Sequence, residues 1–328
     1  MTGRGSDDDP GPWRRGPRRQ GDAPADPAAR GERTPPRGDR APWPGGRTQG
    51  RDDRSAPRRD GPRPASAGRT DTSAPEAPPP PRGGRGGELR LHGFNAVQAV
   101  FARRPEAIRK VYLNQSRIPH LQPLLKWCVA QRVGYRVVTD DELGKLAASA
   151  HHEGVVADVL RPPPLSLADW LPTLEPGPQC LLWLDGVGNP HNFGAILRSA
   201  AHFGVAAVLL AETSTLSLSG AAARVAEGGA EVVPLVRLGP TAESIPTLRA
   251  AGFELAATVV REGRPLFAAA APQRLVYVLG AEGEGMDAEL AAACDLRVSI
   301  PGTGAVDSLN VASATAVLLA HWAATRGN

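Results

Sequence analysis

Three glycine-containing segments carry polar side chains at spacings that could support chemistry. The first, "DGVGNPHNFGAILRSA" (185–200), holds Asn192 near a predicted helix start and Arg198 six residues further on, in an otherwise apolar stretch. Asn192 or His191 is expected to cap that helix. A guanidinium in such a place is either a solvated helix residue or a group that binds a phosphate or carboxylate. Both interpretations stay open for this segment alone.

The second segment, "LGAEGEGM" (279–286), directly follows an apolar run. Its glycines would allow a ligand to approach the backbone closely, but their spacing is GxxGxG and not the GxGxxG of dinucleotide-binding folds. Glu282 and Glu284 would repel a pyrophosphate, which disfavours NAD. The segment therefore indicates either a site for a cationic or hydroxyl-bearing ligand or a plain turn with exposed acids.

The third segment, "SIPGTGAVDSLNVASATAVLLAHW" (299–322), joins a glycine turn to a polar cluster and a small-residue apolar helix that is expected to be buried. Helix capping by Asp307, Ser308 or Asn310 would explain the cluster. A ligand site is the alternative, but this segment taken alone favours capping.

The elements that would position these segments alternate between strands and helices from residue 179 onward. The expected strands are 180–185, 205–211, 231–238, 253–260, 274–280 and 296–300, and the expected helices are 192–204, 219–229, 244–252, 287–294 and 307–324. This alternation predicts an α/β fold with a mostly parallel sheet covered by helices on both faces. Ligands in such folds bind beyond the carboxyl ends of the strands, so the three segments are expected to form one composite pocket.

A smaller α/β domain is predicted for residues 88–161. Its expected order is α-β-α-β-α-β, with helices at 94–105, 121–134 and 140–149 and strands at 108–113, 135–139 and 154–160. Asp140 is the expected cap of the third helix. The proline-rich residues 162–178 show no period and are predicted to link this domain to the one at 179–328.

Residues 1–87 form a distinct compositional region. They contain 17 Pro, 16 Gly and no Leu, Ile, Val, Phe or Tyr, so they are predicted to be disordered. Their 18 Arg and 12 acidic residues give them an excess of six positive charges, whereas the whole chain carries only +4. Such a tail either contacts a polyanion, RNA above all, or serves as a solubilising extension.

The remaining composition narrows the class of protein. Cys128, Cys180 and Cys294 are far apart and form no CxxC pair, so they are expected to be core residues and not a disulfide or zinc framework. No metal-ligand cluster is expected. The chain shows neither a secretory signal nor an 18-residue apolar run, which predicts a cytoplasmic protein without membrane spans.

The three segments also resemble a known family. "NPHNFGAILRSAAHFG", "YVLGAEGEGM" and "SIPGTGAVDSLNVASATAVLL" are similar, in order and spacing, to the three motifs of the SpoU/TrmH family of RNA 2′-O-ribose methyltransferases, within the SPOUT superfamily. Residues 92–160 resemble the family's small L30e-like substrate-binding domain, through "LHGFNAVQAVFARRPEAI" and "HHEGVV". The resemblance covers nearly all of 88–328 and is greatest to a long-tailed, two-domain tRNA/rRNA methyltransferase-like branch.

The resemblance implies a C-terminal trefoil knot, a homodimer and S-adenosylmethionine as methyl donor, without a metal. Residues matching the family's donor-binding positions are Leu279, Gly280, Gly283, Ile300, Pro301 and Leu309. Those matching its catalytic polar positions are Asn192, Arg198, Glu282, Ser308 and Asn310. In the family the arginine matching Arg198 engages the RNA phosphate and helps to activate the ribose hydroxyl. The implied substrate is rRNA or tRNA, with guanosine as a candidate nucleotide.

Some positions depart from the family pattern. Gly302 stands where the family often has Met, Ala305 where many members have Ser, and Asp307 adds a negative charge near the expected RNA path. An active 2′-O-methyltransferase and an RNA-binding protein of the same fold with little or no activity both remain open. A nucleotide-binding oxidoreductase is disfavoured by the acidic second segment.

Overall fold

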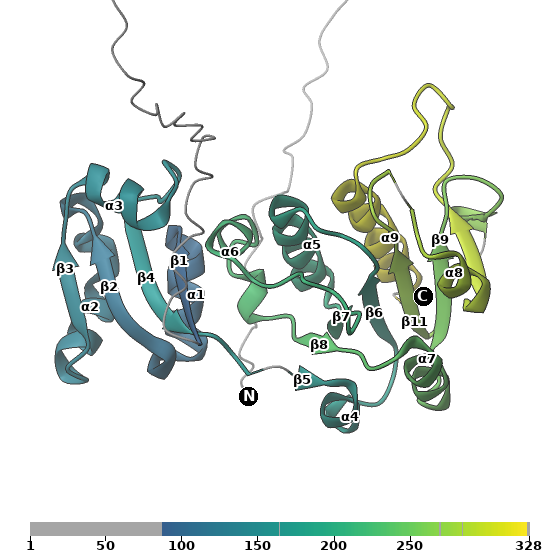
Figure 1. The fold of residues 1–328 in the computed structure, drawn as a ribbon, viewed down its shortest axis with the longest axis horizontal. Helices are drawn as coiled ribbons and strands as arrows, with labels where there is room; N and C mark the ends of the chain where they lie inside the picture. The colour runs from purple at the N-terminus through teal and green to yellow at the C-terminus, as the bar shows by residue number, and fades with distance from the viewer. Residues whose placement is uncertain (1–86, 164, 269, 284, 327–328) are drawn as a thin grey trace, which may run out of the picture. The chain divides into compact units, whose positions relative to one another are not determined.

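Two β-sheets organise the described part of the chain in the computed structural model (Figure 1). The structure describes residues 87–163, 165–268, 270–283 and 285–326. Apart from Gly87, the predicted disordered tail lies outside these residues.

The smaller sheet has four strands in the order β1-β4-β2-β3. These are β1 (Glu88–His92), β2 (Ile108–Leu113), β3 (Gly134–Val137) and β4 (Val155–Leu160), and they are accompanied by α1 (Phe94–Arg103), α2 (Gln122–Ala130) and α3 (Asp140–Ala147). β1 and β2 run antiparallel to β4, and β3 runs parallel to β2.

Two sequence-based expectations for this part are wrong. The predicted order began with a helix, but β1 precedes it and pairs with β4 in a register that sets Leu89 against Val159. The cap of α3 is Thr139 and not Asp140: the Thr139 hydroxyl accepts from the Glu142 amide, and Glu142 reaches back to the Thr139 amide. This reciprocal capping box satisfies two amides that the helix itself cannot.

The larger sheet has eight strands in the order β10-β12-β9-β11-β6-β7-β8-β5. Its strands are β5 (Leu165–Ser166), β6 (Gln179–Leu184), β7 (Ala207–Leu210), β8 (Leu235–Arg237), β9 (Glu254–Thr258), β10 (Arg264–Pro265), β11 (Arg274–Leu279) and β12 (Leu296–Ser299). All of the strand pairs recorded among its described residues are parallel, which confirms the predicted fold class.

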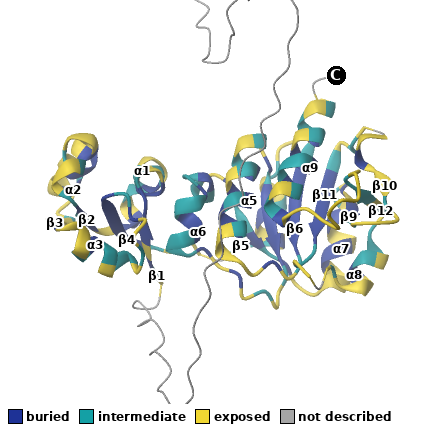
Figure 2. Ribbon diagram, turned by 90° about the horizontal axis from the view of Figure 1, so that it is seen from above, coloured by how far each residue is buried: buried dark blue, intermediate teal, exposed yellow. Residues whose placement is uncertain are grey.

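Helices cover both faces of the larger sheet (Figure 1). One face carries α5 (Pro190–Phe203), α6 (Gly220–Val225) and α9 (Val311–Arg326), and the other carries α4 (Leu167–Trp170), α7 (Thr241–Ala250) and α8 (Ala288–Ala293). Alternate residues of β6 enter the two cores: Leu182 packs with the first set and Trp183 with the second. The central strands are therefore buried on both sides, as Figure 2 shows.

The expected linker 162–178 contains regular structure. β5 pairs with β8, and α4 buries Leu167 and Trp170 against the larger sheet. The elements are two and four residues long, which is too short for a period to be recognised in the sequence. The segment therefore extends the larger sheet instead of only joining two domains.

The three cysteines lie as the sequence predicted. Cys128 and Cys180 are buried, and Cys294 is partly buried. Burial raises the pKa of the Cys128 thiol and of the Cys294 thiol to about 11, so both stay protonated at neutral pH. Among the described residues no helix is long and apolar enough to cross a membrane.

His92, at the end of β1, makes stability depend on pH. It is 3% exposed, and its Nδ1 finds no hydrogen-bond partner within the described ranges. Burial, and next the charge of Arg224, lower the pKa of His92. When the pH falls below about 6.5, the usual pKa of histidine, His92 takes up a proton in the unfolded chain but not in the folded chain. Stability therefore falls as the pH falls through that range.

We expect the free energy of unfolding to decrease between pH 7.5 and pH 5.5, and His92→Gln to flatten this dependence because a glutamine does not titrate. Denaturant titrations at each pH measure it. His120→Gln, which removes an exposed histidine, is the control and should leave the dependence unchanged. An unaltered slope in His92→Gln would assign the pH effect to other groups.

Candidate active site

A single side-chain amide joins all three polar segments. Asn310 Nδ2 donates to Asn192 Oδ1 at 3.0 Å and to Glu282 Oε1 at 2.8 Å. The same Glu282 oxygen accepts from the Val311 amide at 3.3 Å. Segments that are 118 and 28 residues apart in the chain are thus connected at one point.

Asn310 is also the cap of α9. Its Oδ1 accepts from the amides of Ala312, at 2.9 Å, and Ser313, at 3.4 Å, and the helix begins at Val311. Of the three capping candidates in the third segment, Asn310 takes this role, and Asp307 and Ser308 precede the helix. Capping and the connection to Glu282 use opposite ends of one amide.

The cap of α5 differs from the expected one. Asn189 Oδ1 accepts from the amides of His191, at 2.8 Å, and Asn192, at 3.4 Å, and Pro190 occupies the first helical position. The expectation that Asn192 or His191 caps this helix is therefore wrong. Because Asn189 caps α5, the Asn192 side chain is left to accept from Asn310. The Asn-Pro pair was the sequence signal, since proline favours the first turn of a helix.

A pocket of about 730 Å³ opens beyond the carboxyl ends of β9, β11 and β12. All six predicted donor-binding residues line it, and so do three of the predicted catalytic residues: Leu279, Gly280, Gly283, Ile300, Pro301, Leu309, Glu282, Ser308 and Asn310. Asn192 is connected to this pocket through its contact with Asn310. The second and third segments thus form its walls, whereas the composite-pocket prediction also included the first segment, which only contacts it through Asn192.

The glycines of the second segment close its loop. A Cβ at Gly280 would lie 2.5 Å from the backbone of Gly285, where the Ala281 amide donates to the Gly285 carbonyl at 2.9 Å. Gly283 has a φ of +90°, a region that side chains disfavour. These glycines let the loop fold back on itself and present Glu282 towards Asn310.

The loop after β9 was not predicted to be part of the site. Thr258 to Arg261 line the pocket, and Arg261 Nη2 lies 2.9 Å from Asp307 Oδ1. Both side chains are highly exposed, so the pair adds little to stability. It does offset the negative charge that Asp307 brings to the pocket. The sequence could have predicted this from position alone, because the loop also follows an apolar strand and so lies at the same edge of the sheet.

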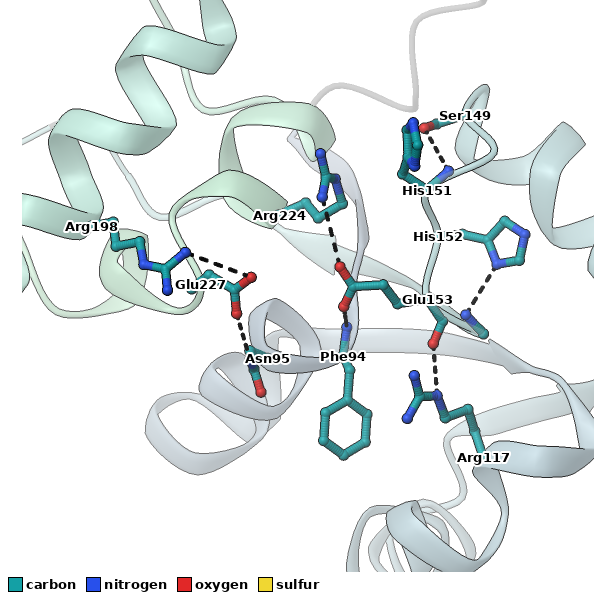
Figure 3. A network of polar contacts seen from close by, with 11 residues as sticks. Phe94, Asn95, Arg117, Ser149, His151, His152, Glu153, Arg198, Arg224 and Glu227 are labelled. Carbon is teal, nitrogen blue, oxygen red and sulfur yellow. Dashed lines mark hydrogen bonds and ion pairs between the residues drawn. The ribbon is translucent and has the colours of Figure 1, made fainter. Parts of the chain in front are cut away.

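Arg198 lies outside this pocket. Its side chain is 64% exposed on α5, and Nη1 is 3.9 Å from Glu227 Oε1 (Figure 3). It borders a separate groove together with residues of α1. Four of the five predicted catalytic residues are thus brought together, and Arg198 is not among them. No group of three or more potential metal ligands occurs within the described residues.

Comparison with known proteins agrees with this geometry. The profile of the SpoU rRNA Methylase family matches residues 179–320, and a profile described as RNA 2′-O ribose methyltransferase substrate binding matches residues 90–165. The uncharacterized tRNA/rRNA methyltransferase YfiF of Escherichia coli O157:H7 is 40% identical over 239 residues, which cover 73% of this chain and 68% of that protein.

The chain belongs to the SpoU rRNA methylase family. A further relative, the 23S rRNA (guanosine-2′-O-)-methyltransferase RlmB of Bordetella pertussis, is 38% identical over 233 residues, covering 70% of this chain and 94% of RlmB. The resemblance seen in the three segments is therefore confirmed.

Solved structures support the SpoU fold. AviRb from Streptomyces viridochromogenes, solved in complex with AdoMet, matches with a TM-score of 0.60 and 24% identity over 74% of this chain and 90% of AviRb. An AdoMet-bound rRNA methyltransferase from Sinorhizobium meliloti matches with the same score and identity over 73% of this chain and 87% of that protein.

The two roles of Asn310 in this SpoU chain can be separated by substitution. Asn310→Ser keeps a good helix cap but is too short to reach Glu282, whereas Asn310→Ala loses both functions. We expect Asn310→Ala to lower the free energy of unfolding by about 1 kcal/mol and Asn310→Ser to lower it less. Both should speed amide hydrogen exchange in residues 279–286, because Glu282 loses its Asn310 contact and keeps only that of the Val311 amide. Unchanged exchange in both variants would show that Asn310 does not hold that loop.

Proposed function

We propose that this chain transfers a methyl group from S-adenosylmethionine to the 2′-hydroxyl of a ribose in rRNA or tRNA. The observation that carries the proposal is the pocket at the sheet edge, whose walls are the second and third segments held together by Asn310. Family membership and the RlmB relatives support the reaction, and their name makes guanosine a candidate nucleotide.

The pocket suits the methyl donor in size and chemistry. Its volume of about 730 Å³ falls within the usual range for small-molecule sites. Leu279, Ile300 and Leu318 supply apolar walls, while the Gly280 backbone is accessible beside them. Glu282 at the wall disfavours a phosphate-bearing ligand and favours a cationic one. When bound, the donor supplies a methyl group on a sulfonium ion.

The chain's own residues would position and activate the ribose hydroxyl. A hydroxyl is a weak nucleophile at neutral pH and must lose its proton as it attacks. Glu282, Ser308 and Asn310 all line the pocket and would contact the ribose there. Arg198, about 9 Å further along α5 than Asn192, would bind a backbone phosphate of the same RNA strand and so hold the ribose hydroxyl close to the methyl carbon.

Finer features belong to the same proposal. We expect residues 88–161 to act as an L30e-like substrate-binding domain and 179–328 as the catalytic domain with a trefoil knot. Residues 88–161 carry 11 basic and 7 acidic side chains, whereas residues 162–328 carry 9 basic and 15 acidic ones, which favours RNA contact by residues 88–161.

We also expect a homodimer. Val306 and Leu309, which are 72% and 47% exposed at the pocket, are candidates for burial in its interface. We place this activity in the cytoplasm.

Calorimetry with S-adenosylmethionine tests the donor site. Wild-type protein should bind the donor, and Leu309→Arg should abolish binding by placing a long cation in the pocket. Val129→Arg, which alters an exposed valine of α2, is the matched control and should bind normally. No binding to wild type at millimolar donor would contradict the enzyme and favour an RNA-binding protein of this fold.

Arg198→Ala should reduce turnover about a hundredfold because the RNA phosphate is no longer held, while donor affinity stays within twofold. Arg264→Ala removes another exposed arginine and serves as control. Single-turnover methylation measures the effect, on RNA chosen by mapping ribose methylation in cells with and without the gene. A turnover equal to that of wild type would remove Arg198 from the mechanism.

A further inference from the structure

Three glutamates of the described ranges adopt a backbone conformation that side chains disfavour, and two of them contact α1. Glu153 has a φ of +53° and Glu227 a φ of +52°, both in the left-handed region. Strained residues of this kind concentrate at functional sites. Both glutamates contact the start of α1, at the junction between the two sheets (Figure 3).

The two carboxylates make the same pair of contacts. Glu227 Oε2 accepts from the Asn95 side-chain amide, and its Oε1 lies 3.9 Å from Arg198 Nη1. Glu153 Oε2 accepts from the Phe94 amide at 2.9 Å, and its Oε1 lies 3.7 Å from Arg224 Nη1. Each carboxylate thus joins a residue of α1 to an arginine of the methylase part, residues 179–320. The two α1 residues, Phe94 and Asn95, are consecutive.

The other end of α1 is firmly held. Arg104 makes two hydrogen bonds to the Glu231 carboxylate, at 2.5 and 2.8 Å, and the side chains are only 17% and 8% exposed. Arg104 also donates to the Leu160 carbonyl. Asn95 therefore projects from a helix that is fixed at both ends, so it can restrict where the Glu227 carboxylate lies.

Arg198 borders a groove that suits an anion. The groove, of about 550 Å³, lies between α1, α5 and the turn at Glu227, and Arg103 and His202 also line it. The Arg103 side chain has no polar partner among the described residues. Glu227 is the single acid among the described lining residues, and it faces Arg198.

We propose that Glu227 is a positioning residue for Arg198, and that Asn95 fixes Glu227 so that the docking of α1 sets where Arg198 lies. This inference rests on the proposed function, in which Arg198 binds an RNA phosphate. A separation of 3.9 Å is a loose ion pair. It limits the rotamers of an exposed arginine yet allows the guanidinium to pass to a phosphate that enters the groove.

Glu227→Gly is the informative variant because glycine tolerates the left-handed conformation. We expect an unchanged or higher unfolding midpoint but a three- to tenfold lower kcat/KM for RNA, the effect of one released side chain, with unchanged donor affinity. Removing a negative charge would by itself tighten RNA binding and raise kcat/KM, so a fall in kcat/KM cannot come from the change in charge. Glu262→Gly is the matched control: Glu262 is exposed, has a φ of +60° and makes no polar contact with described residues.

A double-mutant cycle separates positioning from a structural role. Asn95 and Arg198 share Glu227, and no hydrogen bond between these two described residues is recorded. Asn95→Ala should lower kcat/KM in the wild-type background and have no further effect in Arg198→Ala. An equal loss in both backgrounds would overturn the inference and leave Asn95 as an interface residue.

The mobility of Arg198 gives a readout that does not depend on catalysis. The ¹⁵Nε–H signal of Arg198, assigned by its loss in Arg198→Lys, should report greater side-chain motion in Glu227→Gly and Asn95→Ala than in wild type. Equal order in all three proteins would refute positioning even if methylation were observed. Increased motion together with an inactive wild type would sustain the positioning inference and overturn the proposed reaction instead.

Discussion

The Asn310 side chain is the interaction on which the site depends. Its amide nitrogen has two hydrogens and its oxygen two acceptor positions, and all four contacts are made: to Asn192, Glu282, Ala312 and Ser313. Serine or aspartate could cap α9 equally well, but neither can also donate two hydrogen bonds. Each contact is worth about 1 kcal/mol, so their effect lies less in stability than in placing three distant segments.

The parallel sheet brings those segments within reach of one amide. β6 and β11 are neighbours, so the segments that follow Leu184 and Leu279 begin side by side, and the Asp185 amide donates to the Leu279 carbonyl. The shared edge of a parallel sheet was predictable, because continuous apolar runs such as that of β6 indicate buried parallel strands, but the pairing of β6 with β11 was not predicted. The sequence did not predict β1, β5 or the caps at Asn189 and Thr139. Short elements show no period, and several neighbouring polar side chains could have capped each helix.

The arginines of the methylase part mostly serve the fold. Arg237 donates to backbone carbonyls at Ser214 and Leu216, and Arg249 pairs with Asp295. Residues 162–328 contain more acidic than basic side chains, so few arginines there remain available to bind RNA. The sequence could place Arg198 on α5, but helical spacing alone could not show that it borders a groove separate from the donor pocket, because that depends on where α1 docks.

The backbone at Glu153 and Glu227 shows what this docking requires. A left-handed conformation costs a residue with a side chain about 1 kcal/mol, and each glutamate precedes a glycine, Gly154 or Gly228, that is also left-handed. Glycine at the glutamate positions would remove that cost. The side chain is retained where its two carboxylate oxygens reach α1 and an arginine at once, which no backbone group there could do. The strain therefore supports a connection between the two parts of the chain, and at Glu227 that connection ends on Arg198.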